Sequence, residues 1–263
     1  MARPIIALLT DFGTASHYAG TMKGVVLTLC PDVMLVDITH DIPPHDVLTG
    51  AIELAASYKY FPAGTIFLAV VDPGVGSARR GLIADTGDYR FGAPDNGVLT
   101  SVLREHKPKR VVELTERRYA RPTVSRTFEG RDRFAPAAAW LAKGTEPTAM
   151  GRPVTNWLQL DIPEPHEEEA ALVGEVVLVD RFGNLVTNID RRRFDQFRHE
   201  ESISIAVDGQ VVDRLVATYA EAPAGSICAL FGSSDHLELA LNGGSAAHQL
   251  GVGRGATIRI DRR

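Results

Sequence analysis

The chain has 263 residues, of which 44% are hydrophobic and 23% charged, and its formal net charge at pH 7 is -5. This composition is typical of a globular protein, and the acidic balance argues against a surface that follows nucleic-acid phosphates. Cys30 and Cys228 lack the spacing of a zinc site or a disulfide framework, and no apolar run approaches the ~20 residues of a membrane span. We therefore expect a cytoplasmic protein that binds neither nucleic acid nor membrane.

The first half of the sequence alternates short apolar runs with segments of helical periodicity. This alternation is typical of βαβ units, so residues 1–160 are predicted to form an N-terminal α/β sandwich domain. Asp46 is the predicted N-cap of the second helix, and Gly144 is predicted to end the third. The helices are predicted at 18–29, 47–58 and about 131–144, and the strands at 5–10, 33–38, 66–71, 82–85, 89–92 and 111–114.

Residues 161–170 read DIPEPHEEEA, where two prolines and a run of carboxylates interrupt the periodicity. We interpret this segment as a linker. Beyond it, residues 171–263 carry short alternating strands, which favour a small antiparallel barrel. The fold class is therefore predicted to be α/β, with a C-terminal antiparallel β-barrel domain. Its strands are predicted at 174–180, 184–189, 202–207, 226–231, 236–241 and 256–260.

Two acidic residues follow predicted strands of the first domain. Asp11 comes directly after the first strand, where open α/β folds bind ligands, and it could accept the hydroxyls of a ribose. A turn or helix N-cap is the alternative role for Asp11. Asp72 opens a glycine-rich turn that ends near Arg79, whose guanidinium could hold the carboxylate ionised. A structural ion pair explains the same spacing, and the loop lacks the third glycine of a dinucleotide fingerprint.

Two further segments place polar and aromatic side chains at the ends of elements. The segment FEGRDRFAP is typical of a helix entrance, which favours anions, although Glu129 and Asp132 could simply be first-turn acids. In the second domain, Phe182 could stack on a purine while Asn184 hydrogen-bonds to the purine edge. An Asx-type turn beginning at Asp180 explains the same residues.

The densest group of potential metal ligands consists of His40, Asp41, His45 and Asp46. Two prolines extend the chain between them, and Asp46 already has a capping role, so we predict no metal site. The sequence contains no GxSxG, HExxH or Walker motif, which argues against several common hydrolase classes.

Taken together, the motifs of this chain resemble those of the S-adenosylmethionine hydroxide adenosyltransferases, a family related to the fluorinase and chlorinase enzymes. They follow one another in order over nearly the whole chain, as far as LELALNGGSAA near the C-terminus. This makes the resemblance far more specific than any single motif. The segments are TDFG at Thr10, MKG at Met22, THDIPPHDV at Thr39, VVDPGVGSAR at Val70, APDNGVLT at Ala93, FEGRDRFAP at Phe128 and DRFGNLVTNI at Asp180.

The resemblance implies an enzyme that hydrolyses S-adenosylmethionine to adenosine and L-methionine without a cofactor. It also implies a homotrimer, with active sites between the N-terminal domain of one subunit and the C-terminal domain of its neighbour. Asp72 and Arg79 match two members of the Asp-Arg-His set that positions the water, and Glu129 stands at the third position. The implied substrate-binding residues are Asp11 for the ribose, Asp180 for the methionine amine, Phe182 and Asn184 for the adenine, Ser233 for the methionine end, and Phe128.

This chain departs from the family pattern at a few positions. The family has histidine in the pattern F-H-G-R-D where this chain has Glu129, and glutamate is ordinarily a weaker base than histidine. Its charge beside Asp72 could raise the pKa of one carboxyl of the pair. Ser16 replaces an acid that is common in the family. Gly130 stands where the fluorinase has a halide-contacting serine, and the fluorinase's extra loop is absent, so halide chemistry is disfavoured.

We hypothesise that Asp72 and Arg79 orient a water behind the ribose 5′ carbon, while Glu129 acts as a hydrogen-bond acceptor or base. One alternative is a non-catalytic protein that binds S-adenosylmethionine or adenosine. Another is an adenosyltransferase that uses a different nucleophile, such as a halide. A purely structural role is disfavoured, because the polar motif residues fall at predicted strand ends rather than along one continuous surface.

Overall fold

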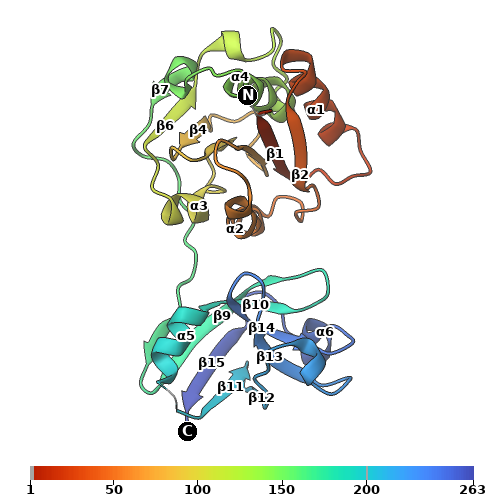
Figure 1. Cartoon of the computed structure of the whole chain (residues 1–263), viewed down its shortest axis with the longest axis vertical. Helices are drawn as coiled ribbons and strands as arrows, with labels where there is room; N and C mark the ends of the chain where they lie inside the picture. Colours follow the sequence, from red (N-terminus) through yellow and green to blue (C-terminus); the bar gives the residue numbers. More distant parts are fainter. Residues whose placement is uncertain (1–2, 200) are drawn as a thin grey trace. The chain divides into compact units, whose positions relative to one another are not determined.

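A computed structural model describes residues 3–199 and 201–263 of the chain. The chain divides into two compact units, Met1–Asp161 and Ile162–Arg263. The first unit is a mixed α/β sandwich, and the second is a nearly closed antiparallel barrel (Figure 1). The predicted fold class is therefore confirmed.

The first unit is built on a seven-stranded sheet with the order β2-β1-β3-β5-β4-β6-β7. The pairs β2–β1, β1–β3 and β3–β5 are parallel, whereas β5–β4, β4–β6 and β6–β7 are antiparallel. All five residues of β3 are buried, as expected for a parallel strand covered on both faces. The strands are β1 Ile5–Thr10, β2 Met34–Thr39, β3 Ile66–Val70, β4 Gly81–Asp85, β5 Arg90–Pro94, β6 Arg110–Leu114 and β7 Gly151–Pro153.

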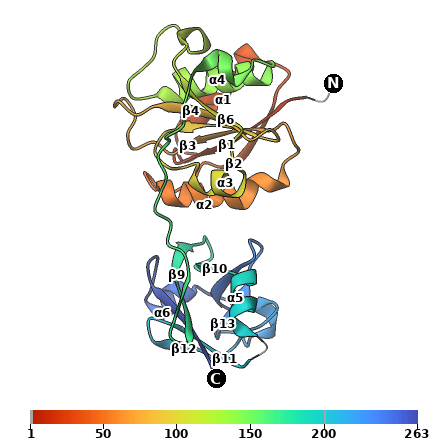
Figure 2. The same cartoon turned by 90° about the vertical axis from the view of Figure 1, so that its left-hand side faces the viewer.

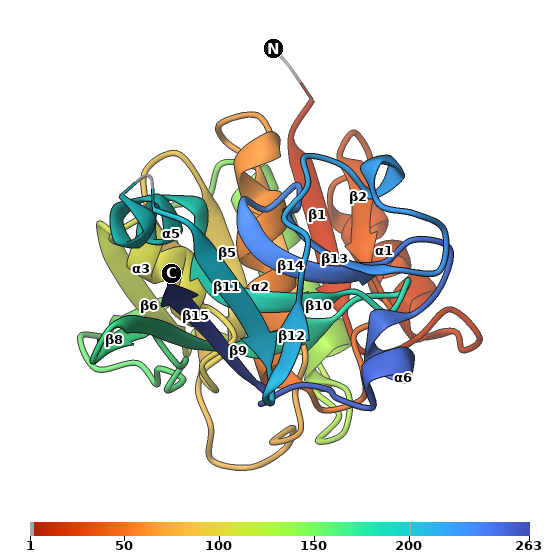
Figure 3. The same cartoon turned by 90° about the horizontal axis from the view of Figure 1, so that it is seen from below.

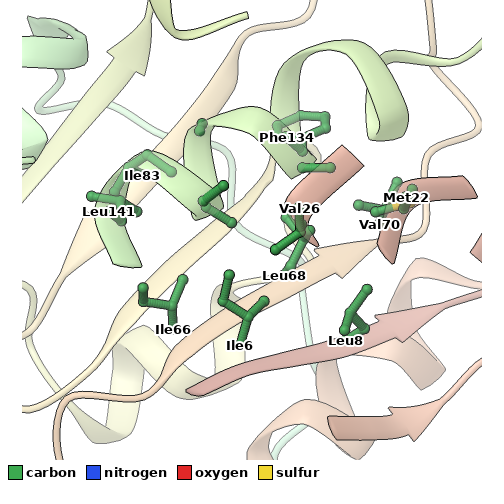
Figure 4. Packing of buried hydrophobic residues seen from close by; sticks show 14 of the residues in the cluster. Ile6, Leu8, Met22, Val26, Ile66, Leu68, Val70, Ile83, Phe134 and Leu141 are labelled. Carbon is green, nitrogen blue, oxygen red and sulfur yellow. The ribbon is translucent and has the colours of Figure 1, made fainter. Parts of the chain in front are cut away.

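Helices cover both faces of this sheet, with α1 and α4 on one side and α2 and α3 on the other (Figure 2). They are α1 Tyr18–Leu29, α2 Val47–Ser57, α3 Thr100–Glu105 and α4 Ala135–Ala142, with short 3₁₀ turns at Tyr58–Tyr60, Arg117–Tyr119 and Pro147–Met150. Each face has its own apolar core. Met22 and Val26 of α1 pack with Ile6 and Leu8 of β1 and with Phe134 in the first core, which Figure 4 shows.

The predicted helix at 131–144 consists of two parts. A π-helix, η3, spans Gly130–Phe134 and continues directly into α4, and Gly144 beyond it has a φ of 89°. Left-handed glycine after a helix is the expected C-terminal stop. The sequence did not predict α3, because six residues are too few to show helical periodicity. No helix in the described residues has the length and apolar character to cross a bilayer.

The second unit is an antiparallel sheet with the order β12-β11-β15-β9-β10-β14-β13 that curls into a barrel (Figure 3). A bridge between Leu215, just after β12, and Ala229 in β13 brings the two edges of the sheet together. The interior is filled by apolar residues such as Phe194 and Leu239. The strands are β9 Ala171–Val179, β10 Leu185–Asp190, β11 Ile203–Val207, β12 Gln210–Val212, β13 Ile227–Phe231, β14 His236–Leu241 and β15 Thr257–Arg262.

Five short elements of this unit, including β12, were not predicted. Part of the segment interpreted as a linker, His166–Glu168, forms the short strand β8, which pairs with β9. Helix α5, Arg191–Arg198, follows β10 directly. A 3₁₀ turn spans Tyr219–Glu221, and the short helix α6 spans Ala246–Leu250. All of these elements are short, and α5 is dominated by charged residues, so none shows a clear apolar period.

Asp46 caps α2 as predicted: its side chain accepts hydrogen bonds from the Thr49 backbone N–H at 3.1 Å and from the Thr49 hydroxyl at 2.8 Å. We expect Asp46→Ala to lower the free energy of unfolding by about 1 kcal/mol, because an N-terminal donor of the helix loses its partner. Urea denaturation followed by circular dichroism measures this loss. The exposed Asp41→Ala is the control, with an expected change within about 0.5 kcal/mol. Equal losses in both variants would contradict the capping role.

Candidate active site

Two acidic residues follow neighbouring strands at one edge of the first sheet. β1 and β3 pair in parallel with Thr10 opposite Val70, so both strands end at the same level. Asp11 directly follows β1, and Asp72 lies two residues beyond β3. The carboxyl ends of parallel strands are where open α/β sheets bind ligands. The fold therefore places both predicted site residues at the edge where sheets of this kind bind ligands.

The loop after β3 returns Arg79 onto Asp72. Arg79 Nε donates to Asp72 Oδ1 at 2.6 Å, and Arg79 Nη2 donates to Asp72 Oδ2, so the ion pair is bidentate. The same Nη2 donates to Glu129 Oε2 at 2.9 Å. The side chains of Asp72, Arg79 and Glu129 are 5%, 8% and 10% exposed. The structure thus brings the three predicted catalytic residues into one buried cluster.

Gly76 sets the shape of this loop. Its φ is 77°, and a β carbon at this position would lie 2.1 Å from the carbonyl oxygen of Arg126. Only glycine permits both the left-handed backbone and this close approach. The loop that carries Asp72 therefore packs directly against the segment that leads to Glu129.

Glu129 stands at the N-cap of the π-helix η3 and is buried. Arg133, four residues later, donates from Nη1 to Glu129 Oε2 at 2.9 Å and from Nη2 to the Leu114 carbonyl oxygen at 2.8 Å. Glu129 Oε2 therefore accepts from two guanidinium groups. Sequence reasoning missed Arg133, although a glutamate and an arginine four residues apart at a helix entrance are a recognisable signal.

Asp132 has a structural role, which was one of the two predicted possibilities for the acids of this segment. Its side chain is fully buried and accepts from Arg131 Nε at 2.7 Å and from the Ser125 backbone N–H at 2.8 Å. Burial alone would raise the pKa of Asp132, but these hydrogen bonds lower it overall. Asp132 thus anchors the preceding loop to η3.

The pKa of Asp72 is raised above the ordinary aspartate value. Burial is the main cause, and the charges of Glu129 and Asp11 add to it, while Arg79 opposes it. The folded chain therefore holds a proton on Asp72 at pH values where the unfolded chain has lost it. The contribution of Asp72 to stability is fully present below the ordinary pKa and is lost as the pH rises through the raised pKa.

Asp11 is held by the loop that follows β2. Its Oδ2 accepts from the His45 backbone N–H at 2.9 Å, and His45 has a positive φ of 68°. The Gly13 N–H also donates to the His40 carbonyl oxygen at 2.7 Å. The loop after β2 therefore holds the loop after β1 at Asp11 and at Gly13.

Two residues of the group that resembled metal ligands in the sequence, His40 and Asp46, have other side-chain partners. His40 Nδ1 lies 2.8 Å from Thr10 Oγ1, and His40 Nε2 lies 3.1 Å from Asp37 Oδ1. Lys23 Nζ donates to the other oxygen of this carboxylate, Asp37 Oδ2, at 2.6 Å. Asp46 caps α2. Across residues 3–199 and 201–263, no three His, Cys, Asp or Glu side chains are grouped to hold a metal ion.

Phe128 belongs to an aromatic cluster beside Glu129. Its ring packs edge-on against Phe12 and Tyr18, with centroid distances of 5.8 and 5.1 Å, and the Arg131 guanidinium lies 5.0 Å from its centroid. Phe128 itself is buried, whereas Tyr18 is exposed. The cluster therefore gives the segment around Glu129 a rigid aromatic support.

A second group of predicted residues lies in the turn between β9 and β10. Asp180 Oδ1 accepts from the backbone N–H groups of Phe182 and Asn184, both at 2.8 Å, and Oδ2 accepts from Asn184 Nδ2 at 2.9 Å. This is the Asx-type turn that was the predicted alternative. It leaves the Phe182 ring 76% exposed. Ser233 lies in the turn after β13, and among the described residues no hydrogen bond links it to Asp180.

Glu238 of β14 is a buried acid that sequence reasoning missed. Tyr219 donates its hydroxyl to Glu238 Oε2 at 3.1 Å, and burial, with the charge of Asp180 adding to it, raises the pKa of Glu238. The available signal was an acid between two apolar residues, Leu237 and Leu239, of an otherwise largely apolar strand. Glu238 gives the second unit another carboxyl group near Asp180.

Comparison with known proteins gives matches over both units. The model of the SAM (S-adenosylmethionine) hydroxide adenosyltransferase N-terminal domain matches residues 6–151, and that of the C-terminal domain matches residues 174–259. A relative from Thermus thermophilus, named (R)-S-adenosyl-L-methionine hydrolase, is 37% identical over 98% of this chain and 99% of its own length. One with the same name from Salinispora tropica is 36% identical over 98% and 97%. A solved structure of an uncharacterized conserved protein from Thermotoga maritima has a TM-score of 0.91 at 34% identity, covering 98% of this chain and 100% of that one.

Arg79 is the shared partner of two buried carboxylates, so its removal has a predictable cost. We expect Arg79→Met to lower the free energy of unfolding by about 3–5 kcal/mol near neutral pH, because Asp72 loses its buried ion-pair partner. Without Arg79 the pKa of Asp72 in the folded chain rises further. The loss of stability should therefore be larger at pH 8, which lies further above the pKa of Asp72 in the unfolded chain, than at pH 5. Denaturant titrations at both pH values measure it. The exposed Arg117→Met is the control, and a loss independent of pH would contradict this account.

Proposed function

The chain belongs to the SAM hydroxide adenosyltransferase family, and we propose that it is an enzyme that hydrolyses S-adenosylmethionine to adenosine and L-methionine. The observation that carries the proposal is the buried cluster of Asp72, Arg79 and Glu129 at the ligand-binding edge of the sheet. Similarity over nearly the whole chain to relatives named as hydrolases of this substrate supports it.

The proposed reaction is an in-line displacement at the ribose 5′ carbon. The water oxygen forms a bond to this carbon while the carbon–sulfur bond breaks, and the electron pair of that bond passes to sulfur. The sulfonium becomes the neutral thioether of methionine, and the water gives up one proton. Because the leaving group needs no proton and no electrons are exchanged with another molecule, the reaction as proposed requires no cofactor.

The task left to the protein is alignment, which can contribute about 7–11 kcal/mol to lowering a barrier in favourable cases. We assign the orientation of the water to Asp72, which Arg79 holds in place by two hydrogen bonds. The raised pKa of Asp72 makes its carboxylate a better proton acceptor than an ordinary aspartate. Glu129 keeps Oε2 on Arg79 and Arg133, and its other oxygen can accept a hydrogen bond from the water.

Binding of the substrate is assigned to residues of both units. Asp11, with one oxygen on the His45 N–H, can accept ribose hydroxyls through the other. The exposed Phe182 ring is available for stacking on adenine. The remaining assignments are Asn184 to the adenine, Asp180 to the methionine amine, Ser233 to the methionine end, and Phe128 to the wall beside Glu129.

The space around Gly130 favours water over a halide as the nucleophile. A β carbon at this position would lie 3.2 Å from Met22 Sδ and 3.4 Å from Val70 Cγ1, which is tight contact. The position where the fluorinase has a halide-contacting serine therefore accommodates a side chain only if its neighbours shift. The non-catalytic binding alternative is separated from hydrolysis by the product assay below.

Turnover in ¹⁸O-labelled water tests the proposed chemistry. We expect adenosine and methionine in equal amounts, with the label in the adenosine 5′ hydroxyl, as measured by chromatography with mass spectrometry. Asp72→Asn should lower kcat about 100-fold or more, because it removes the carboxylate that holds the water. The exposed Asp88→Asn is the matched control.

Different outcomes of that assay favour different functions. Saturable binding of S-adenosylmethionine without adenosine above the protein-free control would establish the binding protein instead. A 5′-halogenated adenosine formed on addition of chloride or fluoride would establish a different nucleophile.

We also propose that the chain works as a homotrimer, with each active site completed by residues of two subunits. Light scattering should then give a mass about three times the 28.5 kDa of the chain. Asp72→Asn and Asp180→Asn should each have strongly reduced activity alone, whereas co-expressed mixtures should regain activity, because some sites then combine the intact residue of each chain. A monomeric mass, or mixtures as inactive as the parents, would refute the shared site.

A further inference from the structure

Glu129 has a second cationic partner outside the set of Asp72, Arg79 and Glu129. Arg133 Nη1 and Arg79 Nη2 each lie 2.9 Å from the same oxygen, Glu129 Oε2. Among the described residues no hydrogen bond reaches Glu129 Oε1. The carboxylate is therefore fixed through one oxygen and has the other free.

The charges of the site show why a second cation is needed. The charges of two further carboxylates, those of Asp11 and Glu129, act on Asp72 at the sheet edge, and Arg79 already gives two of its hydrogen bonds to Asp72. A buried carboxylate without sufficient compensation is costly. With Arg133 the count is three carboxylates to two guanidinium groups, whereas without it Arg79 alone would serve both Asp72 and Glu129.

Arg133 is itself held in place. Its Nη2 donates to the Leu114 carbonyl oxygen at the end of β6, so its guanidinium connects Glu129 to the central sheet. The next residue, Phe134, is fully buried in the core, which fixes η3 at this point. The Arg133 side chain is 23% exposed and lines a surface cavity of about 710 Å³, so it can be shortened without a clash.

From these contacts we infer that Arg133 is a positioning residue for the hydrolysis: it compensates the charge of Glu129 and holds Oε2, so that Arg79 stays on Asp72 and Glu129 Oε1 faces the water. The inference rests on the proposed function. Arg133 acts on the reaction only through Glu129 and touches no substrate. Loss of Arg133 leaves Arg79 to be divided between two carboxylates, which displaces Asp72 from the water.

A comparison of Arg133→Met with Arg133→Lys tests this role. Methionine keeps an unbranched apolar stem but removes the guanidinium and its charge. We expect kcat to fall about 10- to 100-fold with KM unchanged, since misplacement of the reacting groups, not weaker binding, is the defect. Lysine restores the charge but not both hydrogen bonds, and should recover part of kcat. Arg121→Met, which lines the same cavity and pairs with Asp132 at 3.4 Å, is the control and should keep its kcat.

A double-mutant cycle with Glu129→Gln separates positioning from general stability. If Arg133 acts through Glu129, the double variant should have the kcat of Glu129→Gln alone, so the two losses are not additive. Unchanged kcat in Arg133→Met, or fully additive losses, would overturn the inference while the wild-type chain still forms adenosine. A wild-type chain that forms none would instead overturn the proposed function. Should Arg133→Met not fold, Arg133→Gln, which can still donate to the Leu114 carbonyl, makes the same comparison.

Discussion

The pairing of buried carboxylates with a small number of guanidinium groups is the constraint on which the candidate site depends. Asp72 and Glu129 come from segments 57 residues apart, and both contact the single side chain of Arg79. Two carboxylates brought together out of water repel each other, and a cation between them offsets that repulsion. Arg79 therefore does more than neutralise charge, because it determines where both acids lie.

The sheet supplies the positions that this ion-pair cluster requires. Parallel pairing of β1 with β3 brings Asp11 and Asp72 to one edge, and apolar cores on both faces hold the strands rigid. The loop after β3 closes against the segment before Phe128 only because residue 76 has no side chain. Backbone packing thus sets the distance between Asp72 and Glu129 before their side chains interact.

The sequence predicted those features that depend on neighbouring residues. Asp46 as a helix cap and the contact of Arg79 with Asp72 both arise within a few residues, so spacing was informative. The roles of the site residues came from the family resemblance. The contact of His40 with Thr10 could not be predicted, because it depends on how the ends of β1 and β2 meet. Arg133 was missed for a different reason: its local signal was present, but Glu129 was interpreted either as a first-turn acid or as the third member of the catalytic set, and neither role needs a second cation.

The Phe182 ring, held outward by the Asx turn of Asp180, has a thermodynamic consequence. In the structure of the chain the apolar surface of this ring is exposed to water. An aromatic base that stacks on the ring releases this water, and the loss of hydrated apolar surface makes the heat capacity of association negative. Because the turn already fixes the backbone on both sides of the ring, little chain entropy opposes docking there, and the enthalpy of association should become more favourable as the temperature rises.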